Sequence, residues 1–207
     1  MSVPQTILFA TGNPHKLEEV AAVFAPSGIA VGGLGAVGRS IEEPVENGLT
    51  FIDNAILKAR YYAAKTGLIA MADDSGLVVD ALGGAPGVVS ARYAGVSGGR
   101  AVVDPANNAK LLRELEPVPD EKRTARFVCV VALCEADRTL VVARGEVEGI
   151  ILRTGRGASG FGYDPLFFLP GLGQTTAELE PEMKNAISHR GRATREMIRL
   201  LERIWGR

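Results

Sequence analysis

The chain has 207 residues, 46% of them hydrophobic, which is ordinary for one globular domain that spans residues 1–207 and buries roughly 70% of the surface of its unfolded chain. Its formal net charge of −1 argues against a protein dedicated to nucleic acid or to a membrane surface, because both need a net basic field. The N-terminus lacks the features of a secretory signal and no apolar run reaches membrane-spanning length, so we expect a cytoplasmic protein.

Strands and helices alternate in the first half of the chain. Apolar periodicity and turn residues predict a strand at 5–10, a helix at 15–25, a strand at 29–34, a loop at 35–49, a helix that ends near 65, and two strands within 68–82 separated by an acidic turn. Asn13 is a natural N-cap for the first helix, and Pro14 suits its first position. Thr50 caps the second helix, with Asp53 completing a capping box and Gly67 ending the helix.

A long hairpin is predicted in the second half. Residues 124–136 and 139–152 read as two strands joined by a tight turn at 137–138. Cys129 and Cys134 have odd spacing within the first of these strands, so we expect them to face opposite sides of it and to remain reduced.

Helical segments are predicted on either side of the hairpin. Asp104-Pro105 marks the start of a helix that carries several leucines. A glycine-rich loop at 154–173 leads to a mostly helical, arginine-rich C-terminus, whose alternating charges indicate a solvated, salt-bridged helix face. The order of the elements predicts an α/β fold with a mixed β-sheet flanked by helices.

The first segment that could carry chemistry joins the first strand to the first helix, with the sequence Thr11-Gly12-Asn13-Pro14-His15-Lys16. A glycine turn, the N–H groups of a helix start and a lysine are the components of an anion site. The segment lacks the spacing of a P-loop or of a dinucleotide fingerprint. An ordinary strand-to-helix turn with a solvated lysine is therefore the alternative.

The second segment is the acidic pair Asp73 and Asp74, which follows an apolar run at 68–72 and precedes Ser75-Gly76. Because apolar residues flank the pair, its charge must be matched by a cation or by hydrogen-bond donors. We interpret it as the centre of an active site. A turn in which an aspartate accepts from backbone amides is the alternative.

Further charged side chains precede the acidic pair in the chain. The loop at 35–49 carries Glu42, Glu43 and Glu46, and Lys58 lies on the helix that follows. Carboxylates from two elements around one hard cation leave room for water and phosphate oxygens, which is the usual arrangement for magnesium.

The third segment is the glycine-aromatic loop at 159–165. Its glycines allow close approach of a flat ligand, Phe161 offers a stacking face, and Asp164 offers an acceptor for ring N–H groups. Loops of this composition are often no more than loops.

The fourth segment, residues 184–190, gathers Lys184, Ser188, His189 and Arg190 near a helix start. Such a group suits the recognition of phosphate and of carbonyl acceptors. The alternative is a polar turn between helices, with Ser188 as an N-cap.

Taken together, the motifs resemble those of the inosine/xanthosine triphosphate pyrophosphatase family. The matching segments occur in order over nearly the whole chain: Thr11-Gly12-Asn13 with Lys16, Thr50-Phe51 with Asn54-Ala55 and Lys58-Ala59, Ala72-Asp73-Asp74-Ser75-Gly76-Leu77, Gly83-Gly84-Ala85-Pro86-Gly87, Ser90-Ala91-Arg92-Tyr93, Phe161-Gly162-Tyr163-Asp164-Pro165, and Lys184-Asn185 with Ser188-His189-Arg190. The resemblance implies a magnesium-dependent enzyme that hydrolyses ITP, dITP and XTP to the monophosphate and pyrophosphate, and so removes deaminated purines from the nucleotide pool. It also implies an elongated sheet, two lobes with a deep substrate cleft between them, and a homodimer.

The same resemblance implies roles for the residues near the phosphates. The 11–16 segment would hold the triphosphate, with Lys16 as its cation. Asp74 would bind magnesium and serve as the general base, with Asp73 beside it. The remaining phosphate-side residues would be Asn54 and Lys58 near the phosphates, Ser75 against the substrate, and Glu46 as a second metal ligand, or Glu43 in its place.

The resemblance also implies a base pocket. The purine would stack on Phe161, and Asp164 would bond its edge. Lys184, His189 and Arg190 would complete the purine pocket, and Gly162 and Tyr163 would also bind the substrate. Donors from His189 or Arg190 suit a 6-oxo purine, whereas the 6-amino group of adenine would face them donor to donor. The exclusion of guanine would then depend on its 2-amino group.

Two other classes of function remain open from the sequence. A phosphatase acting on modified pyrimidine triphosphates or on sugar phosphates would use the same anion loop and acidic pair with another base pocket. A nucleotide-sensing module would bind such a ligand without turnover, although it has little need of a metal-poised carboxylate pair.

Overall fold

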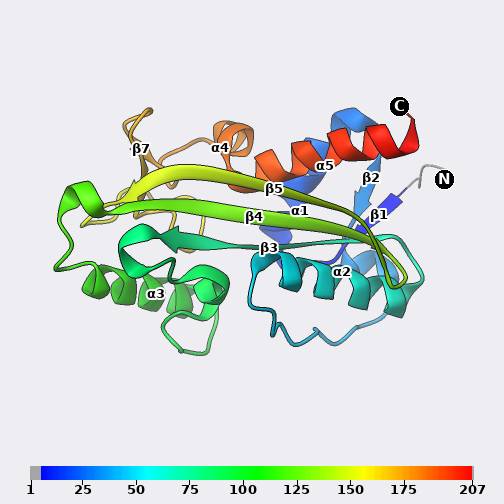
Figure 1. Ribbon diagram of the computed structural model, residues 1–207, viewed down its shortest axis with the longest axis horizontal. Coiled ribbons are helices and arrows are strands. Elements are labelled where there is room, and N and C mark those ends of the chain that lie inside the picture. Colours follow the sequence, from blue (N-terminus) through cyan, green and yellow to red (C-terminus); the bar gives the residue numbers. More distant parts are fainter. Residues whose placement is uncertain (1–5, 207) are drawn as a thin grey trace. The chain divides into compact units, whose positions relative to one another are not determined.

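The computed structural model describes residues 6–206, in which a seven-stranded mixed sheet has the strand order β2-β1-β3-β4-β5-β6-β7 (Figure 1). The strands are β1 (Thr6–Phe9), β2 (Ala30–Gly32), β3 (Ala70–Val79), β4 (Thr124–Glu135), β5 (Arg138–Ile151), β6 (Phe167–Leu169) and β7 (Gln174–Thr175). The α-helices are α1 (Pro14–Phe24), α2 (Phe51–Thr66), α3 (Arg100–Glu114), α4 (Pro181–Ile187) and α5 (His189–Trp205). The predicted α/β fold, a mixed sheet flanked by helices, is confirmed. Residue 5 of the first predicted strand lies outside the described residues.

The helix starts follow the predicted capping chemistry. The side chain of Asn13 accepts a hydrogen bond from the His15 N–H, and Pro14 occupies the first position of α1. Thr50 and Asp53 form a reciprocal capping box at the start of α2, and Gly67 ends that helix in the left-handed conformation at φ 70°. These caps satisfy N–H groups that have no partner within the helix, so the two elements that carry Lys16 and Lys58 begin at fixed residues.

The predicted acidic turn at residues 73–76 is wrong. Strand β3 runs without a break from Ala70 to Val79 and includes Ser75 and Gly76. β3 lies between β1 and β4 in the sheet, and its parallel pairing with β1 places Leu8 opposite Ala70. Pairing with neighbouring strands overrides the local turn preference of an Asp-Asp-Ser-Gly sequence.

The predicted start of the third helix is also wrong. Helix α3 begins at Arg100, after the break at Gly98, whose φ is 141°, and Pro105 lies inside the helix. At the sixth position of α3, Pro105 has no N–H to donate to the carbonyl of residue 101, so the helix continues through it with one backbone hydrogen bond fewer. As a result, Arg100 and Asp104 share one helix.

The hairpin of β4 and β5 is confirmed, with Ala136 in its turn at φ 51°. Cys129 and Cys134 are both free and buried, and they pack into different hydrophobic clusters. The odd spacing therefore places them on opposite faces of β4, as predicted.

By internal contacts the chain divides into two compact units. The first contains residues 1–74, 129–146 and 188–207, and the second contains residues 75–128 and 147–187. In the first unit, α1 and α5 pack on one face of the strands around Phe9 and Met197, while α2 packs on the other face around Leu8 and Tyr62. The second unit has a core of its own, built from strand residues, α3 and the loop around Tyr163. The predicted cleft between two lobes remains a prediction.

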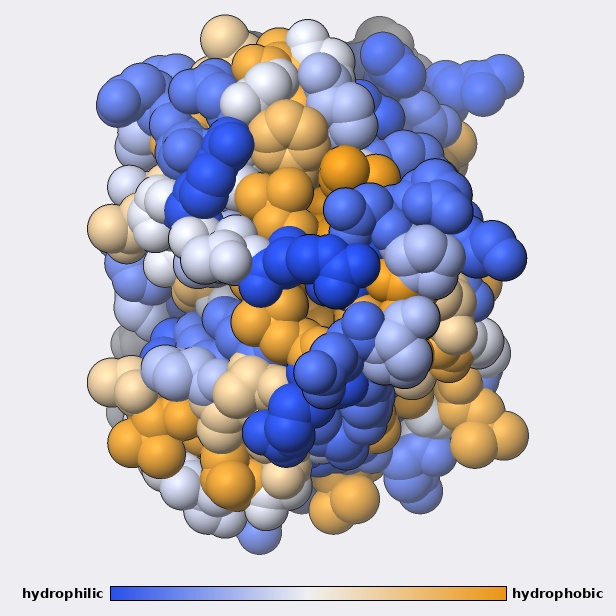
Figure 2. Space-filling model, turned by 90° about the vertical axis from the view of Figure 1, so that its left-hand side faces the viewer, coloured by the Kyte–Doolittle hydropathy of each residue, from blue (hydrophilic) through white to orange (hydrophobic). Residues whose placement is uncertain are grey.

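Figure 2 shows the face on which α3 and β7 of the second unit lie. Strongly hydrophilic side chains interrupt the hydrophobic ones there. One of the exposed apolar side chains of the molecule is Val102 on α3, which is 57% exposed. Single exposed apolar side chains of this kind are ordinary on protein surfaces. Among the described helices, none combines the length and the apolar character that crossing a membrane would require.

Candidate functional site

Asp73 and Asp74 point to opposite faces of β3, because successive side chains alternate along a strand. Asp73 shares its face with Met71 in the cluster covered by α1 and α5, and Asp74 shares its face with Ala72 in the cluster covered by α2. The two carboxylates therefore have different partners and different electrostatics.

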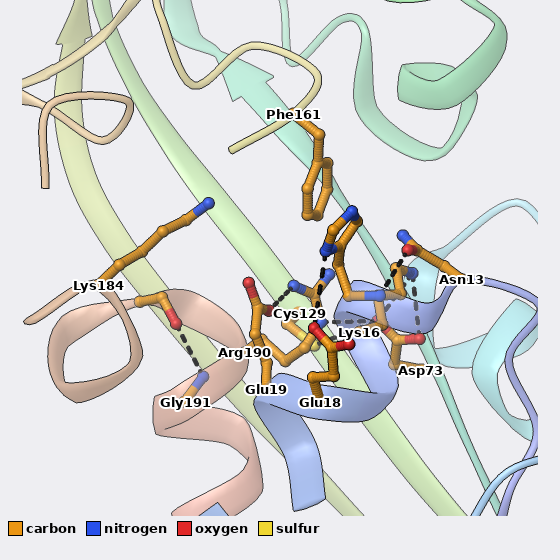
Figure 3. Close-up of polar contacts among 12 residues, drawn as sticks. Asn13, Lys16, Glu18, Glu19, Asp73, Cys129, Phe161, Lys184, Arg190 and Gly191 are labelled. Carbon is orange, nitrogen blue, oxygen red and sulfur yellow. Dashed lines mark hydrogen bonds and ion pairs between the residues drawn. The ribbon is translucent and has the colours of Figure 1, made fainter. Parts of the chain in front are cut away.

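Asp73 is 2% exposed and lies among cations. The ammonium of Lys16 on α1 is 2.9 Å from its Oδ2, and Nε of Arg190 on α5 is 3.3 Å from the same oxygen (Figure 3). Burial alone would raise the pKa of Asp73, but the charges of Lys16 and Arg190 outweigh it and hold the pKa well below its usual range. Asp73 is thus a permanent anion, and it fixes the position of Lys16.

Arg190 is 3% exposed and donates to a second carboxylate, Glu19 on α1. Burial works against its charge, but Asp73 and Glu19 outweigh burial and raise its pKa further. The structure therefore places Arg190 in an ion-pair network that joins α1, β3 and α5. The predicted contact of Arg190 with the purine remains a prediction.

Asp74 lies in a different setting. Its Oδ2 accepts from Nδ2 of Asn54 at 3.1 Å, and the ammonium of Lys58 lies 3.7 Å from its Oδ1. Burial is the main influence on this carboxyl and raises its pKa to about 6, against the opposing effects of Lys58 and Asn54. A carboxyl that titrates near neutrality can take up and release a proton in this range, which is the property of a general base.

Asn54 connects Asp74 to the glutamate loop. While its Nδ2 donates to Asp74, its Oδ1 accepts from the Gly48 N–H at 2.8 Å. A Cβ at Gly48 would lie 2.5 Å from that Oδ1, so only glycine allows this approach. The side chain of Asn54 is fully buried, and it holds the loop against β3.

Lys58 lies between two carboxylates. Its ammonium is 3.1 Å from Oε1 of Glu46 and 3.7 Å from Oδ1 of Asp74. Burial opposes the charge on Lys58, but Asp73, Asp74 and Glu46 outweigh burial and raise its pKa. The carboxylate of Glu43 lies beside Gly12, since a Cβ built there would be 3.0 Å from its Oε1. Of the two glutamates proposed as metal ligands, Glu46 is the one grouped with Asp74.

The segment at 11–16 keeps one unused side-chain donor. The backbone N–H of Asn13 donates to Oγ1 of Thr11 at 3.1 Å, while the amide nitrogen Nδ2 of Asn13 is buried without a hydrogen-bond partner. Pro14 and His15 are exposed. A buried amide without an acceptor is costly, so Nδ2 of Asn13 is suited to an acceptor atom of a ligand.

In the second unit, the loop at 160–164 is held by Asp164. Its Oδ2 accepts from the Phe161 N–H at 2.8 Å and from the ammonium of Lys184 at 2.6 Å, and its Oδ1 accepts from Thr176 at 2.8 Å. A Cβ at Gly160 would collide with this carboxylate and would lie 3.0 Å from Nζ of Lys184. The structure thus gives Asp164 an internal role in shaping the loop, and its contact with a base remains a prediction.

Phe161 is flanked by positive charge. The guanidinium carbon of Arg100 lies 4.5 Å from the centre of its ring, and Nζ of Lys184 lies 5.1 Å from that centre. The hydroxyl of Tyr163, by contrast, points inward and donates to the Ser90 carbonyl at 2.8 Å. Tyr163 therefore anchors the loop that presents Phe161.

The predicted site residues thus form two groups. Those in the first unit are Thr11, Gly12, Asn13, Pro14, His15, Lys16, Glu43, Glu46, Asn54, Lys58, Asp73, Asp74, His189 and Arg190, and those in the second are Ser75, Phe161, Gly162, Tyr163, Asp164 and Lys184. Ser75 follows Asp74 directly in β3, and His189 is the first residue of α5, behind the N-cap Ser188.

Sequence reasoning missed residues that act through these groups. Glu19 pairs with Arg190, and Asp104 and Asn108 on α3 contact the peptide of Gly162. Glu19 lies one helical turn after Lys16, and Asn108 lies one turn after Asp104. This spacing is the only signal that could have grouped them, and it does not identify their distant partners.

Comparisons with known proteins match the chain over nearly its full length. The model of the Ham1 family matches residues 7–200. The dITP/XTP pyrophosphatase of Yersinia pestis is 52% identical over 196 residues, which is 94% of this chain and 96% of that protein. The dITP/XTP pyrophosphatase of Desulforamulus reducens is 50% identical over 199 residues, which is 96% of each chain.

Solved structures agree with these matches. A HAM1 protein from Coxiella burnetii has a TM-score of 0.85 at 41% identity, covering 97% of this chain and all of that one. A nucleoside-triphosphatase and dITP/XTP pyrophosphatase from Mycobacterium abscessus has a TM-score of 0.74 at 46% identity, covering 93% of this chain and 97% of that one. With sequence and fold in agreement from the first strand into α5, this chain belongs to the Ham1 family.

Proposed function

We propose that this protein hydrolyses dITP, ITP and XTP to the nucleoside monophosphate and pyrophosphate, and so removes deaminated purines from the nucleotide pool. The observation that carries the proposal is the identity of about half of all residues with proteins named dITP/XTP pyrophosphatase, over 94% of this chain in the Yersinia pestis case. The site contributes the chemistry: an anion loop with an unused donor, a carboxyl that titrates near neutrality and an aromatic ring beside a lysine.

Magnesium fits the donor set. Asp74 and Glu46 both lie within 4 Å of one cation, the ammonium of Lys58. Within residues 6–206 there is no group of three His, Cys, Asp or Glu side chains that could hold a metal unaided. Magnesium commonly binds through one or two carboxylates and takes its other ligands from water and substrate phosphates. We therefore assign Asp74 and Glu46 as its protein ligands, and magnesium when bound would neutralise charge on the triphosphate.

The residues around the 11–16 segment would bind the triphosphate. Lys16 supplies a positive charge whose position Asp73 fixes at 2.9 Å, and Nδ2 of Asn13 supplies a donor with no acceptor of its own. The N–H groups at the start of α1 add further donors for phosphate oxygens. Lys58 contributes a second ammonium beside Asp74.

The reaction would be cleavage at the α-phosphate. Asp74, oriented by Asn54 at 3.1 Å, accepts a proton from a water molecule, whose oxygen forms a bond to the α-phosphorus. The bond between that phosphorus and the oxygen bridging to the β-phosphate breaks, and pyrophosphate leaves with the bonding electrons. Lys16 and Lys58 would stabilise the charge that develops on the phosphate oxygens.

Recognition of the base would fall to the loop at 160–164 and its neighbours. Phe161 offers its ring for stacking, and Lys184, held by Asp164 at 2.6 Å, offers N–H donors. Donors suit the 6-oxo group of hypoxanthine and xanthine and oppose the 6-amino group of adenine. We further propose a homodimer, which rests on the family resemblance, and a cytoplasmic location, where an enzyme that acts on the free nucleotide pool would meet its substrates.

The test is incubation of the purified chain and magnesium with each of dITP, ITP, XTP, GTP, ATP, dTTP and a sugar phosphate. We expect pyrophosphate rather than orthophosphate from dITP, ITP and XTP, with much slower release from the others. Preferred hydrolysis of dTTP or of the sugar phosphate would indicate a different phosphatase. Binding of ITP without release of pyrophosphate would indicate a nucleotide-sensing module.

A further inference from the structure

Three polar residues on α3 face the loop that carries Phe161. Arg100, Asp104 and Asn108 follow one another at intervals of four residues, which places them on one side of the helix. Each of the three contacts residue 161 or 162. All of these residues belong to the second compact unit.

The peptide groups of Gly162 are held from both sides. Oδ2 of Asp104 accepts from the Gly162 N–H at 2.8 Å, and Nδ2 of Asn108 donates to the Gly162 carbonyl at 3.0 Å. Gly162 has a φ of 62°, a conformation that glycine adopts freely, and it lies in a turn in which the Asp164 N–H donates to the Phe161 carbonyl at 3.3 Å. The two side chains of α3 add to this turn bond and stabilise one backbone conformation next to Phe161.

The ring of Phe161 is held by the same helix. The guanidinium of Arg100 lies 4.5 Å from the ring centre, within the range of a cation–π contact. Arg100 is itself 3.7 Å from Asp104, one turn further along α3. The three residues Arg100, Asp104 and Asn108, the α3 stripe, thus link the orientation of the Phe161 ring to the conformation of the peptide that follows it.

The hydrogen bonding of the Asn108 side chain supports a role in holding the loop. Its Oδ1 is buried without a hydrogen-bond partner, although its Nδ2 is bonded to Gly162. An unpartnered buried acceptor is unfavourable, so an apolar side chain would suit the helix better if packing were the only requirement. The bond to Gly162 gives the asparagine a use that an apolar residue would lack.

We propose that Arg100, Asp104 and Asn108 are positioning residues that fix Phe161 for stacking on the purine and thereby set the selectivity for the base. The inference rests on the proposed function. A ring that is already ordered loses less conformational entropy when the base binds, so the α3 stripe contributes to base affinity without touching the substrate. It has no part in binding the phosphates.

The experiment compares Asp104→Ala and Asn108→Ala with wild type. We expect each variant to raise KM for dITP by about tenfold, because it loses one hydrogen bond that orders the Phe161 loop. The kcat should stay within about twofold of wild type. The ratio of kcat/KM for dITP over GTP should fall. Inhibition by inorganic tripolyphosphate, which has no base, should keep its inhibition constant in both variants.

Two further variants separate positioning from a general effect on folding. Asp104→Asn keeps an oxygen that can accept from the Gly162 N–H, so its KM for dITP should lie much closer to the wild-type value than that of Asp104→Ala. Arg113→Ala removes an exposed arginine from the same helix and should leave KM and selectivity unchanged. Melting temperatures are recorded for every variant, and the kinetic comparison is made below the lowest of them.

Different outcomes would overturn the proposed function and the positioning role of the α3 residues. Failure of wild type to release pyrophosphate from dITP would overturn the proposed function. An active wild type whose Asp104→Ala and Asn108→Ala variants keep both the KM for dITP and the dITP/GTP ratio would overturn the positioning role alone. So would equal weakening of dITP and tripolyphosphate, because that result indicates a general loss of structure.

Discussion

Asp73 and Asp74 are neighbours in the chain, yet Asp73 is paired with Lys16 and Arg190 on one face of β3 while Asp74 accepts from Asn54 on the other. The pKa of Asp73 is held below its usual range, and the pKa of Asp74 is raised to about 6. The acidic pair therefore combines a fixed structural anion with a titratable carboxyl, and the two can be separated by mutation.

Replacement of Asp73 by Asn should reduce stability rather than act on chemistry alone. It leaves Arg190 buried with one carboxylate fewer, and breaking a buried ion pair in this way typically costs about 3–5 kcal/mol in the free energy of unfolding. Since the folded-state pKa is depressed, the contribution is fully present well above pH 3.8. It begins to fall near that pH and is lost as the pH falls through the lower folded-state pKa, so at pH 3 it should be reduced but not absent.

Urea unfolding of wild type and Asp73→Asn at pH 7 and at pH 3 measures this difference. Asp80→Asn is the control, because Asp80 forms an exposed pair with Arg126 that is worth at most about 1 kcal/mol. A difference of the same size at both pH values would contradict the ionic role of Asp73.

Asp74→Asn should lower kcat for dITP by a factor of about 100 to 10,000, the range lost with a general base, while the fold persists. The folded-state pKa of Asp74 is raised to about 6, so its stabilising contribution is present below pH 3.8 and is lost as the pH rises through 6. At pH 8 without magnesium, the variant should therefore melt no lower than wild type. A stable variant with full turnover would remove Asp74 as the base.

Magnesium dependence should distinguish the two glutamates of the loop. Glu46→Gln should raise the magnesium concentration for half-maximal activity by about tenfold, because Glu46 is grouped with Asp74 around Lys58. Glu43→Gln, whose carboxylate lies by Gly12, serves as the matched control. Magnesium titrations of activity and of melting temperature provide two readouts, and a larger effect from Glu43→Gln would reverse the assignment.

Gly160→Ala should damage the base side of the site. A Cβ at this position would displace the Asp164 carboxylate and crowd Lys184, so KM for dITP should rise by about tenfold or more, with tripolyphosphate inhibition unchanged. Gly173→Ala is the control for backbone strain alone, because Gly173 has a similar φ of 68° with open space around it. Equal kinetic effects from the two alanines would show that crowding at Asp164 is irrelevant.

Local chemistry made the starts of α1 and α2 predictable. Asn13 and Thr50 cap α1 and α2 as expected, since a cap depends on residues within three or four positions of each other. Alternation along β4 likewise placed Cys129 and Cys134 on opposite faces. At Ser75-Gly76 a local turn signal competed with strand formation, and the prediction from the local signal was wrong. The neighbouring strand β4 is distant in sequence, so the short segment does not reveal it.

By itself, the sequence determined the α/β class, the caps and the ordered motifs of the Ham1 family, because each depends on residue types at short spacing. Only the tertiary structure decided which charged and polar side chains contact one another. Asp73 and Arg190 are separated by 117 positions, and Asp104 meets Gly162 across 58. Hydrogen bonds and ion pairs act over a few ångströms in space, so periodicity along the chain cannot specify such partners until the strands and helices have packed.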